Sequence, residues 1–389
     1  MTYNFDHPAA RRHTGSYKWD IFKDDDIIPL WVADMDFETA PCIAEAVRKR
    51  AGHSIYGYTL IGQSYYDAII NWFSRRHNWH IEKDWIIYTT GVVPAISATI
   101  KALTLPGEKV LVQTPVYNCF FSSIRNQGCQ IEENELVRKG DSYVIDFEDF
   151  ERRCADEKVT VFLLCNPHNP TGRMWTHEEL ERMNDICLRH GVKIISDEIH
   201  CELAMPGETF SPMAAISDAC RDNCVTLNSP SKSFNTAGLQ IANIICCNPE
   251  IRRRIDRVIN IYELCDVNPF GPVALEAAYN NGEEWLDSLN NYISGNYELL
   301  KTSFAKDLPE ATVIKMEATY LAWIDISRLG ITSEEACRKL LKDGKVYVNS
   351  GTMYGRKAGE GYIRINLACP HSTLKKGIDR ITSTLKMRK

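Results

Sequence analysis

Strand-like and helix-like segments alternate along the middle of the chain, and this alternation most restricts what the chain can fold into. The strand-like segments, rich in apolar and β-branched residues, cover 85–90, 110–113, 159–165, 192–196, 224–227 and 241–247. Strands that alternate with helices form a largely parallel sheet with helices on both faces. The run 159–165 is apolar along almost its whole length, as is typical of a strand covered on both faces. The sequence therefore predicts an α/β fold with a mostly parallel sheet sandwiched by helices.

Local signals predict where two of the helices begin. Gly91 ends a strand-like segment, and helical periodicity follows from 92 to 103, with Pro94 in the first turn, where proline is tolerated. Thr176 and Glu179 have the spacing of a capping box. We therefore expect a second helix to begin directly after Thr176.

The chain of 389 residues is too long for one ordinary domain. From about residue 286 its character changes to a long mixed helix, followed by a strand at 320–325, a helix at 333–341 and a strand at 361–366. This order is typical of a smaller α+β domain. We predict an N-terminal segment at 1–45 that contributes to the small domain and the active-site edge, a large cofactor-binding domain at 46–285 and a small C-terminal domain at 286–389.

Composition excludes several function classes. The formal net charge of −6 argues against nucleic acid as a main partner. No apolar run has the length of a membrane span, and the N-terminus lacks a secretory signal, so we expect a cytoplasmic protein without a membrane partner. The 14 cysteines are scattered, and neither they nor the 10 histidines show metal-ligand spacing, so we expect no metal site.

Several polar or small residues lie directly after predicted strands. They are Gly91, Tyr117, Asn169, Asp197 and Lys232. In open α/β sheets, ligands bind beyond the carboxyl ends of the strands, so these residues could converge on one site. An isolated lysine is usually a solvated surface charge. With these companions, the Lys232 amine is instead a candidate to form a Schiff base with pyridoxal phosphate.

Four motifs, in this order, resemble those of the fold type I pyridoxal phosphate enzymes, the aminotransferase superfamily. They are Asn-Pro-His-Asn-Pro-Thr-Gly at 166–172, Ser-Asp-Glu-Ile-His at 196–200, Ser-Pro-Ser-Lys at 229–232 and Arg-Ile-Asn at 364–366. The resemblance extends over nearly the whole chain. It implies pyridoxal 5′-phosphate as the cofactor and Lys232 as the residue that binds it covalently.

The same resemblance implies roles around the cofactor ring. Asp197 matches the carboxylate that keeps the pyridine nitrogen protonated, and Asn169 matches the asparagine that binds the phenolic oxygen. His200 stands where many relatives carry a tyrosine that reaches the same oxygen. Tyr117 matches the aromatic residue that stacks on the ring. In isolation, these residues would be turn or packing residues.

The phosphate group is expected at the start of the predicted helix, whose free N–H groups and dipole suit an anion. The candidate phosphate residues are Gly91, Val92, Val93, Ser229 and Ser231. Many relatives carry an arginine eight residues after the lysine, but this chain has Gln240 there. The phosphate would then depend more on neutral donors.

The resemblance also implies how substrate and subunits are arranged. Arg364 matches the arginine that binds the substrate carboxylate as a fork, with Asn169 and Ala33 beside it. Tyr58 matches the tyrosine that reaches the phosphate and substrate of a neighbouring subunit. We therefore expect a homodimer.

Within the superfamily, the segments 31–37, 56–59, 197–200 and 231–235 are similar to the cystathionine β-lyase branch, which includes cystalysin-like carbon–sulfur lyases. This branch implies α,β-elimination, with Lys232 removing the α-proton and a thiolate leaving from Cβ. Two alternatives stay open. An aminotransferase shares the early steps, and a regulatory or binding protein could use the same fold with little turnover.

Overall fold

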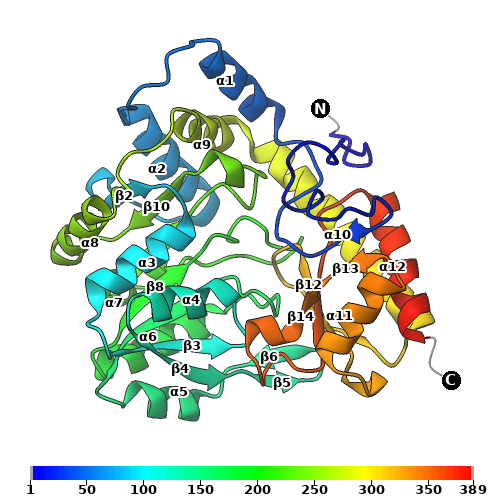
Figure 1. Cartoon of the computed structure of the whole chain (residues 1–389). Helices are drawn as coiled ribbons and strands as arrows, with labels where there is room; N and C mark the ends of the chain where they lie inside the picture. Colours follow the sequence, from blue (N-terminus) through cyan, green and yellow to red (C-terminus); the bar gives the residue numbers. More distant parts are fainter. Residues whose placement is uncertain (1–2, 387–389) are drawn as a thin grey trace.

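A seven-stranded sheet forms the centre of the larger part of the molecule (Figure 1), in the computed structural model, which describes residues 3–386. Its strand order is β2-β10-β9-β8-β7-β3-β4. The strands are β2 (Ile86–Thr89), β3 (Lys109–Thr114), β4 (Gln130–Glu135), β7 (Val159–Cys165), β8 (Lys193–Asp197), β9 (Cys224–Asn228) and β10 (Ala242–Ile245). The five strands from β9 to β4 pair in parallel. The predicted mostly parallel α/β sheet is confirmed.

Strand β10 is the exception, because it runs antiparallel to both β9 and β2. A parallel connection needs a crossover of a dozen or more residues, usually through a helix. The connection 229–241 carries Lys232 and only the short 3-10 turn Ala237–Leu239. With no crossover helix, the chain returns beside β9 in the opposite direction.

Helices cover both faces of this sheet and divide the core in two. On one face, Val110 and Val112 of β3 pack with Ile96 of helix α3 in one apolar cluster. On the other face, Leu111 belongs to a second cluster with Phe150 of α5. This alternation follows from the two-residue period of a strand. The helices of this part are α2 (Gln63–His77), α3 (Val92–Leu103), α4 (Asn118–Asn126), α5 (Phe147–Cys154), α6 (His177–Arg189), α7 (Asp218–Asn223), α8 (Pro249–Ile261) and α9 (Phe270–Asn281).

The predicted helix starts agree with the structure. Helix α3 has the predicted bounds, and α6 begins at His177. The Thr176 side chain accepts from the Glu179 N–H at 3.2 Å, and the Glu179 carboxylate accepts from the Thr176 N–H at 2.9 Å. The capping box is therefore formed, and it fixes the end of the loop that leads from β7 into α6.

The C-terminal part is a four-stranded antiparallel sheet of order β11-β12-β15-β14. Its strands are β11 (Thr312–Val313), β12 (Leu321–Asp325), β14 (Asn349–Ser350) and β15 (Tyr362–Asn366), and its helices are α10 (Glu283–Asp307), α11 (Ser333–Lys342) and α12 (His371–Lys386). The predicted smaller α+β unit is confirmed as a fold, while the exact domain limits stay predictions.

The chain before residue 37 lies against this C-terminal unit, whereas the helix that follows it packs against α9 of the larger part (Figure 1). Strand β1 (Ile28–Pro29) pairs in parallel with β13 (Val346–Tyr347), and helix α1 (Pro41–Ala51) follows it. The remaining pair, β5 (Val137–Lys139) and β6 (Ser142–Val144), forms a separate antiparallel ribbon. Among the described residues, none of the helices combines the length and apolar character that crossing a bilayer requires.

Candidate active site

A cavity of about 610 Å³ lies at the carboxyl ends of the parallel strands. From the large sheet and its loops it is lined by Gly91, Val92, Val93, Tyr117, Asn169 and Asp197. It is also lined by His200, Ser229, Ser231, Lys232, Ala33 and Arg364. The structure therefore brings together all of the sequence-predicted site residues except Tyr58.

Lys232 lies in the loop between β9 and β10, with its amine directed at residues 31–33, which line the cavity. Its Nζ donates to the carbonyl oxygen of Ala33 at 2.6 Å. Burial lowers the pKa of Lys232 to about 8, and the nearby Arg364 acts in the same direction, while Asp34 and Asp197 oppose it. A lysine with this pKa provides an appreciable fraction of neutral amine near neutral pH, as a nucleophile or base requires.

Asp197 is the last residue of β8 and is buried. Its Oδ1 accepts from the Ile199 N–H at 3.1 Å. Burial raises the pKa of Asp197 to about 7, although the Ile199 N–H and the Lys232 charge lower it. A cationic partner stabilises the ionised form of such a buried carboxyl group. Asp197 therefore fits the protonated pyridine nitrogen of pyridoxal phosphate.

The loop after β7 is packed so that Asn169 faces the cavity. His168 contacts Thr171 Oγ1 through Nδ1 at 2.9 Å and the Gln113 carbonyl through Nε2 at 3.2 Å. Gly172 closes the loop at φ +73°, and a Cβ there would lie 3.1 Å from Met316. The final glycine of the motif is thus a backbone requirement of the fold.

Arg364 extends from β15 across the cavity to Asn169. Its Nη1 donates to Asn169 Oδ1 at 3.1 Å, and its Nη2 donates to the Trp31 carbonyl at 2.7 Å. The guanidinium lies 4.8 Å from the centre of the Tyr354 ring. Its buried Nε has no hydrogen-bond partner among the described residues. A buried, incompletely satisfied guanidinium is suited to binding a carboxylate.

His200 is a neutral group at the site. Burial, together with the nearby cationic Lys232 and Arg364, lowers the pKa of His200 to about 3. Its Nδ1 is buried and has no hydrogen-bond partner among residues 3–386. An orphaned ring nitrogen beside Lys232 fits a contact with a cofactor oxygen.

The expected phosphate end of the site is the N-terminus of α3. Gly91 precedes this helix, and no side chain among residues 3–386 caps its first N–H groups, so Val92 and Val93 offer free donors to an anion. Ser231 and Gln240 also line the cavity. Ser229 Oγ donates to the Ile241 carbonyl at 2.6 Å, so its hydroxyl proton is already used within the loop.

Tyr117 and Tyr58 differ in position. Tyr117 precedes α4 and lines the cavity, as a ring-stacking residue would. Tyr58 does not line it and is 95% exposed, beside the exposed Leu60. Within one chain, Tyr58 is therefore separate from the site, and its role in a neighbouring subunit stays a prediction.

Sequence reasoning missed several residues of the site. Tyr17 and Trp31 line the cavity, with ring centres 5.3 Å apart. The Tyr320 hydroxyl donates to the Ala33 carbonyl at 3.2 Å, the same oxygen that Lys232 contacts. Trp31 belongs to the segment 31–37 that resembles the cystathionine β-lyase branch, but it was not predicted as a site residue. No motif or strand end marks Tyr17, since it precedes every strand of the large sheet.

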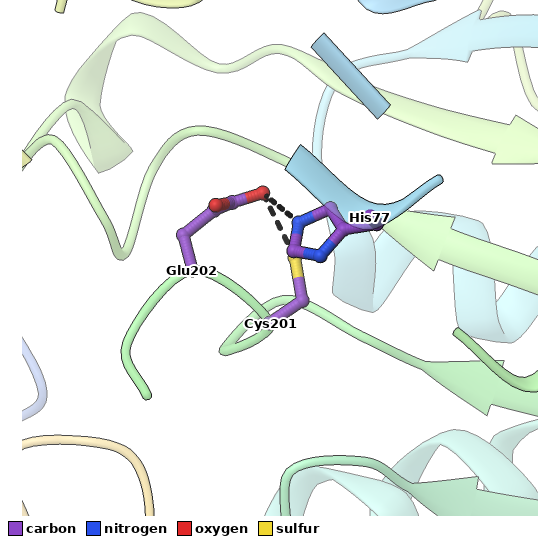
Figure 2. Close-up of side chains that lie close together, drawn as sticks. All are labelled: His77, Cys201 and Glu202. Atoms are coloured by element: carbon purple, nitrogen blue, oxygen red, sulfur yellow. Dashed lines mark hydrogen bonds and ion pairs between the residues drawn. The ribbon is translucent and has the colours of Figure 1, made fainter. Parts of the chain in front are cut away.

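A second group of polar side chains lies outside this cavity (Figure 2). The ligand atoms of His77, Cys201 and Glu202 lie within 4.8 Å of one another, a spacing that could hold a metal ion and that sequence spacing did not reveal. Glu202 Oε1 contacts Trp72 Nε1 at 2.6 Å and His77 Nε2 at 2.7 Å, and Oε2 lies 3.6 Å from Arg76 Nε. Burial acts to raise the pKa of Glu202, but these contacts lower it. They stabilise the buried carboxylate without an ion.

Comparisons with known proteins agree with this geometry. The model of the family "Aminotransferase class I and II" matches residues 25–381. The chain is 41% identical to the cystathionine beta-lyase PatB of Bacillus subtilis, over 98% of this chain and 100% of that protein. Cystalysin of Treponema denticola, solved with pyridoxal 5′-phosphate, is 35% identical, with a TM-score of 0.96 over 99% of both chains. A pyridoxal phosphate-bound putative aminotransferase of Clostridium difficile 630 is 41% identical, with a TM-score of 0.95 over 98% and 100%.

Proposed function

Because this chain belongs to the aminotransferase class I and II family, with pyridoxal phosphate as its cofactor and a cystathionine β-lyase/carbon–sulfur lyase-like sequence, we propose that it is a carbon–sulfur β-lyase. It cleaves L-cystathionine or related cysteine thioethers to a thiol, pyruvate and ammonia. The full-length similarity to a named cystathionine beta-lyase supports this reaction class.

The charge of the cavity is the observation that weighs against transamination with 2-oxoglutarate or glutamate. Among the described residues that line it, the cationic side chains are Lys232 and Arg364. Arg364 is assigned to the α-carboxylate, and Lys232 to the cofactor and the proton. Among the described lining residues, the distal carboxylate of 2-oxoglutarate then has no cation of its own, and leaving that charge without a partner is costly. The distal carboxylate of L-cystathionine differs, because the substrate's own second ammonium group accompanies it.

The chain would hold the cofactor through groups at both ends of the cavity. Asp197 would pair with the pyridine nitrogen, while Asn169 and His200 would contact the phenolic oxygen. Tyr117 would pack on the ring, and the N-terminus of α3 would bind the phosphate. When bound, pyridoxal phosphate supplies an electron-accepting ring that stabilises negative charge at the substrate Cα.

The remaining steps belong to side chains. Arg364 and Asn169 orient the substrate carboxylate, which places the Cα–H bond toward Lys232. The Lys232 amine, with its lowered pKa, removes the α-proton. The electron pair from that bond becomes the Cα–Cβ double bond as the thiolate leaves. The released 2-aminoacrylate is hydrolysed to pyruvate and ammonia.

We also propose that the protein is a cytoplasmic homodimer in which Tyr58 completes the neighbouring site. Four apolar residues of the 55–60 segment are exposed, namely Ile55 (68%), Tyr56 (56%), Tyr58 (95%) and Leu60 (93%). A contiguous exposed apolar segment is typical of an interaction surface. A second copy would bury it.

Product analysis tests the proposed reaction. The protein is incubated with L-cystathionine and, separately, with an amino acid plus 2-oxoglutarate. We expect thiol and pyruvate in equal amounts in the first reaction, and little glutamate in the second. Glutamate formation that exceeds pyruvate plus thiol formation would favour the aminotransferase alternative. Absence of turnover in both reactions, with cofactor bound, would favour a regulatory protein.

A further inference from the structure

One of two segments before α1 contacts the catalytic groups, and the other packs against the first. We call residues 31–37 the strap and residues 11–20 the hook. The strap crosses the cavity with its backbone carbonyls directed at both cations of the site. The Trp31 carbonyl accepts from Arg364 Nη2 at 2.7 Å, and the Ala33 carbonyl accepts from Lys232 Nζ at 2.6 Å. The position of the strap therefore sets the position of both cationic groups.

Two asparagines hold the strap from the large and small units. Asn366 lies two residues after Arg364, and its Nδ2 donates to the carbonyls of Val32 at 2.6 Å and Asp34 at 2.7 Å. Asn235 lies three residues after Lys232, and it exchanges hydrogen bonds of 3.1 Å with the Met35 backbone. These contacts use only backbone groups of the strap, so the carboxylates of Asp34 and Asp36 can bind other partners.

The hook supplies those partners. Lys18 is fully buried, and its Nζ lies 2.9 Å from Asp36 Oδ2 and 3.2 Å from the Asp34 carbonyl. Arg11 donates to Asp34 Oδ2 at 2.8 Å, and Trp19 Nε1 donates to Asp36 Oδ1 at 2.8 Å. Two cations thus balance two carboxylates. Removal of one member would leave a buried charge without its partner.

A single carboxylate shapes the hook itself. Asp20 accepts hydrogen bonds of 2.9 to 3.0 Å from four consecutive backbone N–H groups, those of residues 13–16. These contacts, that from His13 above all, lower the pKa of Asp20 below its usual value. The exposed Asp20 lies on the hook and contacts no residue of the cavity in any of these bonds. It therefore offers a way to loosen the hook without changing the site.

We propose that the hook is a positioning element of the active site, in which Lys18 and Asp36 are positioning residues that fix the strap, and through it Lys232 and Arg364. The inference rests on the proposed role of Lys232 as the cofactor-binding lysine. Reacting groups held out of place by about 1 Å can lose about 100-fold in rate. The alternative is that the hook only adds stability and leaves the geometry of the site unchanged.

The capture of pyridoxal phosphate by the cofactor-free protein separates these two roles, because it requires a placed Lys232 amine but no turnover. The rate is followed by visible absorbance for the wild type, Asp20→Asn and Lys18→Met. Asp24→Asn is the matched control, since Asp24 lies in the same N-terminal region and pairs with Lys345 at 2.9 Å, away from the strap. Circular dichroism and the melting temperature show that each variant is folded, and Lys232→Ala provides the blank.

We expect Asp24→Asn to capture the cofactor at the wild-type rate and Asp20→Asn to capture it several-fold more slowly. For Lys18→Met we expect a decrease in rate on the order of tenfold or more. If Lys18→Met does not fold, Asp20→Asn and Trp19→Phe, which each remove only part of the network, decide the matter. Capture at the wild-type rate by folded hook variants would overturn the proposal. Wild-type capture by Lys232→Ala would instead show that the assignment of Lys232 is wrong.

Kinetics of the loaded enzyme provide an independent check. Because the strap contacts both cations, the hook variants should raise KM, through Arg364, and lower kcat, through Lys232, when rates are normalised to bound cofactor. A purely stabilising hook would change the melting temperature and the amount of active protein but leave both constants unchanged. That result would also overturn the proposal.

Discussion

The guanidinium of Arg364 donates a hydrogen bond of 3.1 Å to Oδ1 of Asn169, and this contact joins β15 of the C-terminal sheet to the loop after β7. The same guanidinium reaches the Trp31 carbonyl of the strap. Three distant parts of the chain thus meet at one side chain. A planar group with several donors can serve them together and still bind a carboxylate.

Replacement of Arg364 by lysine should weaken substrate binding more than cofactor binding. Arg364→Lys keeps a positive charge but loses the fork, so it cannot contact Asn169, Trp31 and a carboxylate at once. We expect the KM for the amino acid to rise roughly tenfold or more, while the cofactor dissociation constant stays close to the wild-type value. Steady-state kinetics and cofactor titration measure the two quantities. An unchanged KM would contradict the assignment of Arg364 to the carboxylate.

The lowered pKa of Lys232 predicts that the cofactor-free protein is destabilised by its own active-site lysine. The pKa falls from 10.5 to about 8 on folding, so the buried charge opposes folding fully below pH 8, and this cost disappears as the pH rises to about 10.5. The shift corresponds to a change in the free energy of unfolding of at most about 3 kcal/mol. Cofactor-free Lys232→Met should therefore be more stable than the wild type at pH 7. Urea unfolding across pH 7 to 10.5 measures the difference, and a constant difference would count against this origin.

A charged donor at Gln240 should strengthen cofactor binding. Gln240 lines the cavity at φ +51°, a conformation that arginine adopts at a cost similar to that of glutamine. Gln240→Arg would give the phosphate a charge-assisted hydrogen bond. We expect the dissociation constant of pyridoxal phosphate to fall by about tenfold. Gln130→Arg, at the exposed start of β4, controls for the added charge, and equal affinities of the two variants would show that Gln240 does not reach the phosphate.

Mixed dimers test whether Tyr58 acts in the neighbouring subunit. Lys232→Ala and Tyr58→Ala are each expected to have low activity, but a dimer of one copy of each contains one intact site. Mixing equal amounts, with subunit exchange, should restore roughly a quarter of wild-type activity, since half of the dimers are mixed and each has one working site. Lys232→Ala mixed with Arg364→Ala is the control, because both residues line the cavity of one chain. Equal recovery in the two mixtures would contradict the proposal.

The large sheet and the centre of the site could be predicted from the sequence because their signals are local. The apolar run of β7 and the capping box before α6 each lie within a few residues, and the motif residues sit directly at strand ends. The direction of β10 could not be predicted in the same way. It depends on the absence of a crossover helix between Lys232 and β10, a property of the connection and not of the strand.

The hook and the strap were also beyond prediction from periodicity. Their order comes from side chains that bond to backbone groups, as when Asp20 accepts from the N–H groups of 13–16 and Asn366 binds the carbonyls of the strap. Such contacts leave no repeating apolar pattern in the sequence. A lysine such as Lys18, preceded and followed by aromatic residues, reads as an ordinary surface charge until its buried partner Asp36 is seen.

The contacts of the strap also set a temporal order for folding. The Asp36 N–H donates to the Ala368 carbonyl and Asn366 binds Val32, so residues near the start of the chain wait for partners more than 300 positions later. At about 5–20 residues per second, synthesis of that interval takes on the order of tens of seconds. During this time the large sheet can form around Lys232. The Ala33 carbonyl is not yet fixed beside the Lys232 amine. A nascent chain therefore gains a complete site for its cofactor only after its last strand, β15, has been made.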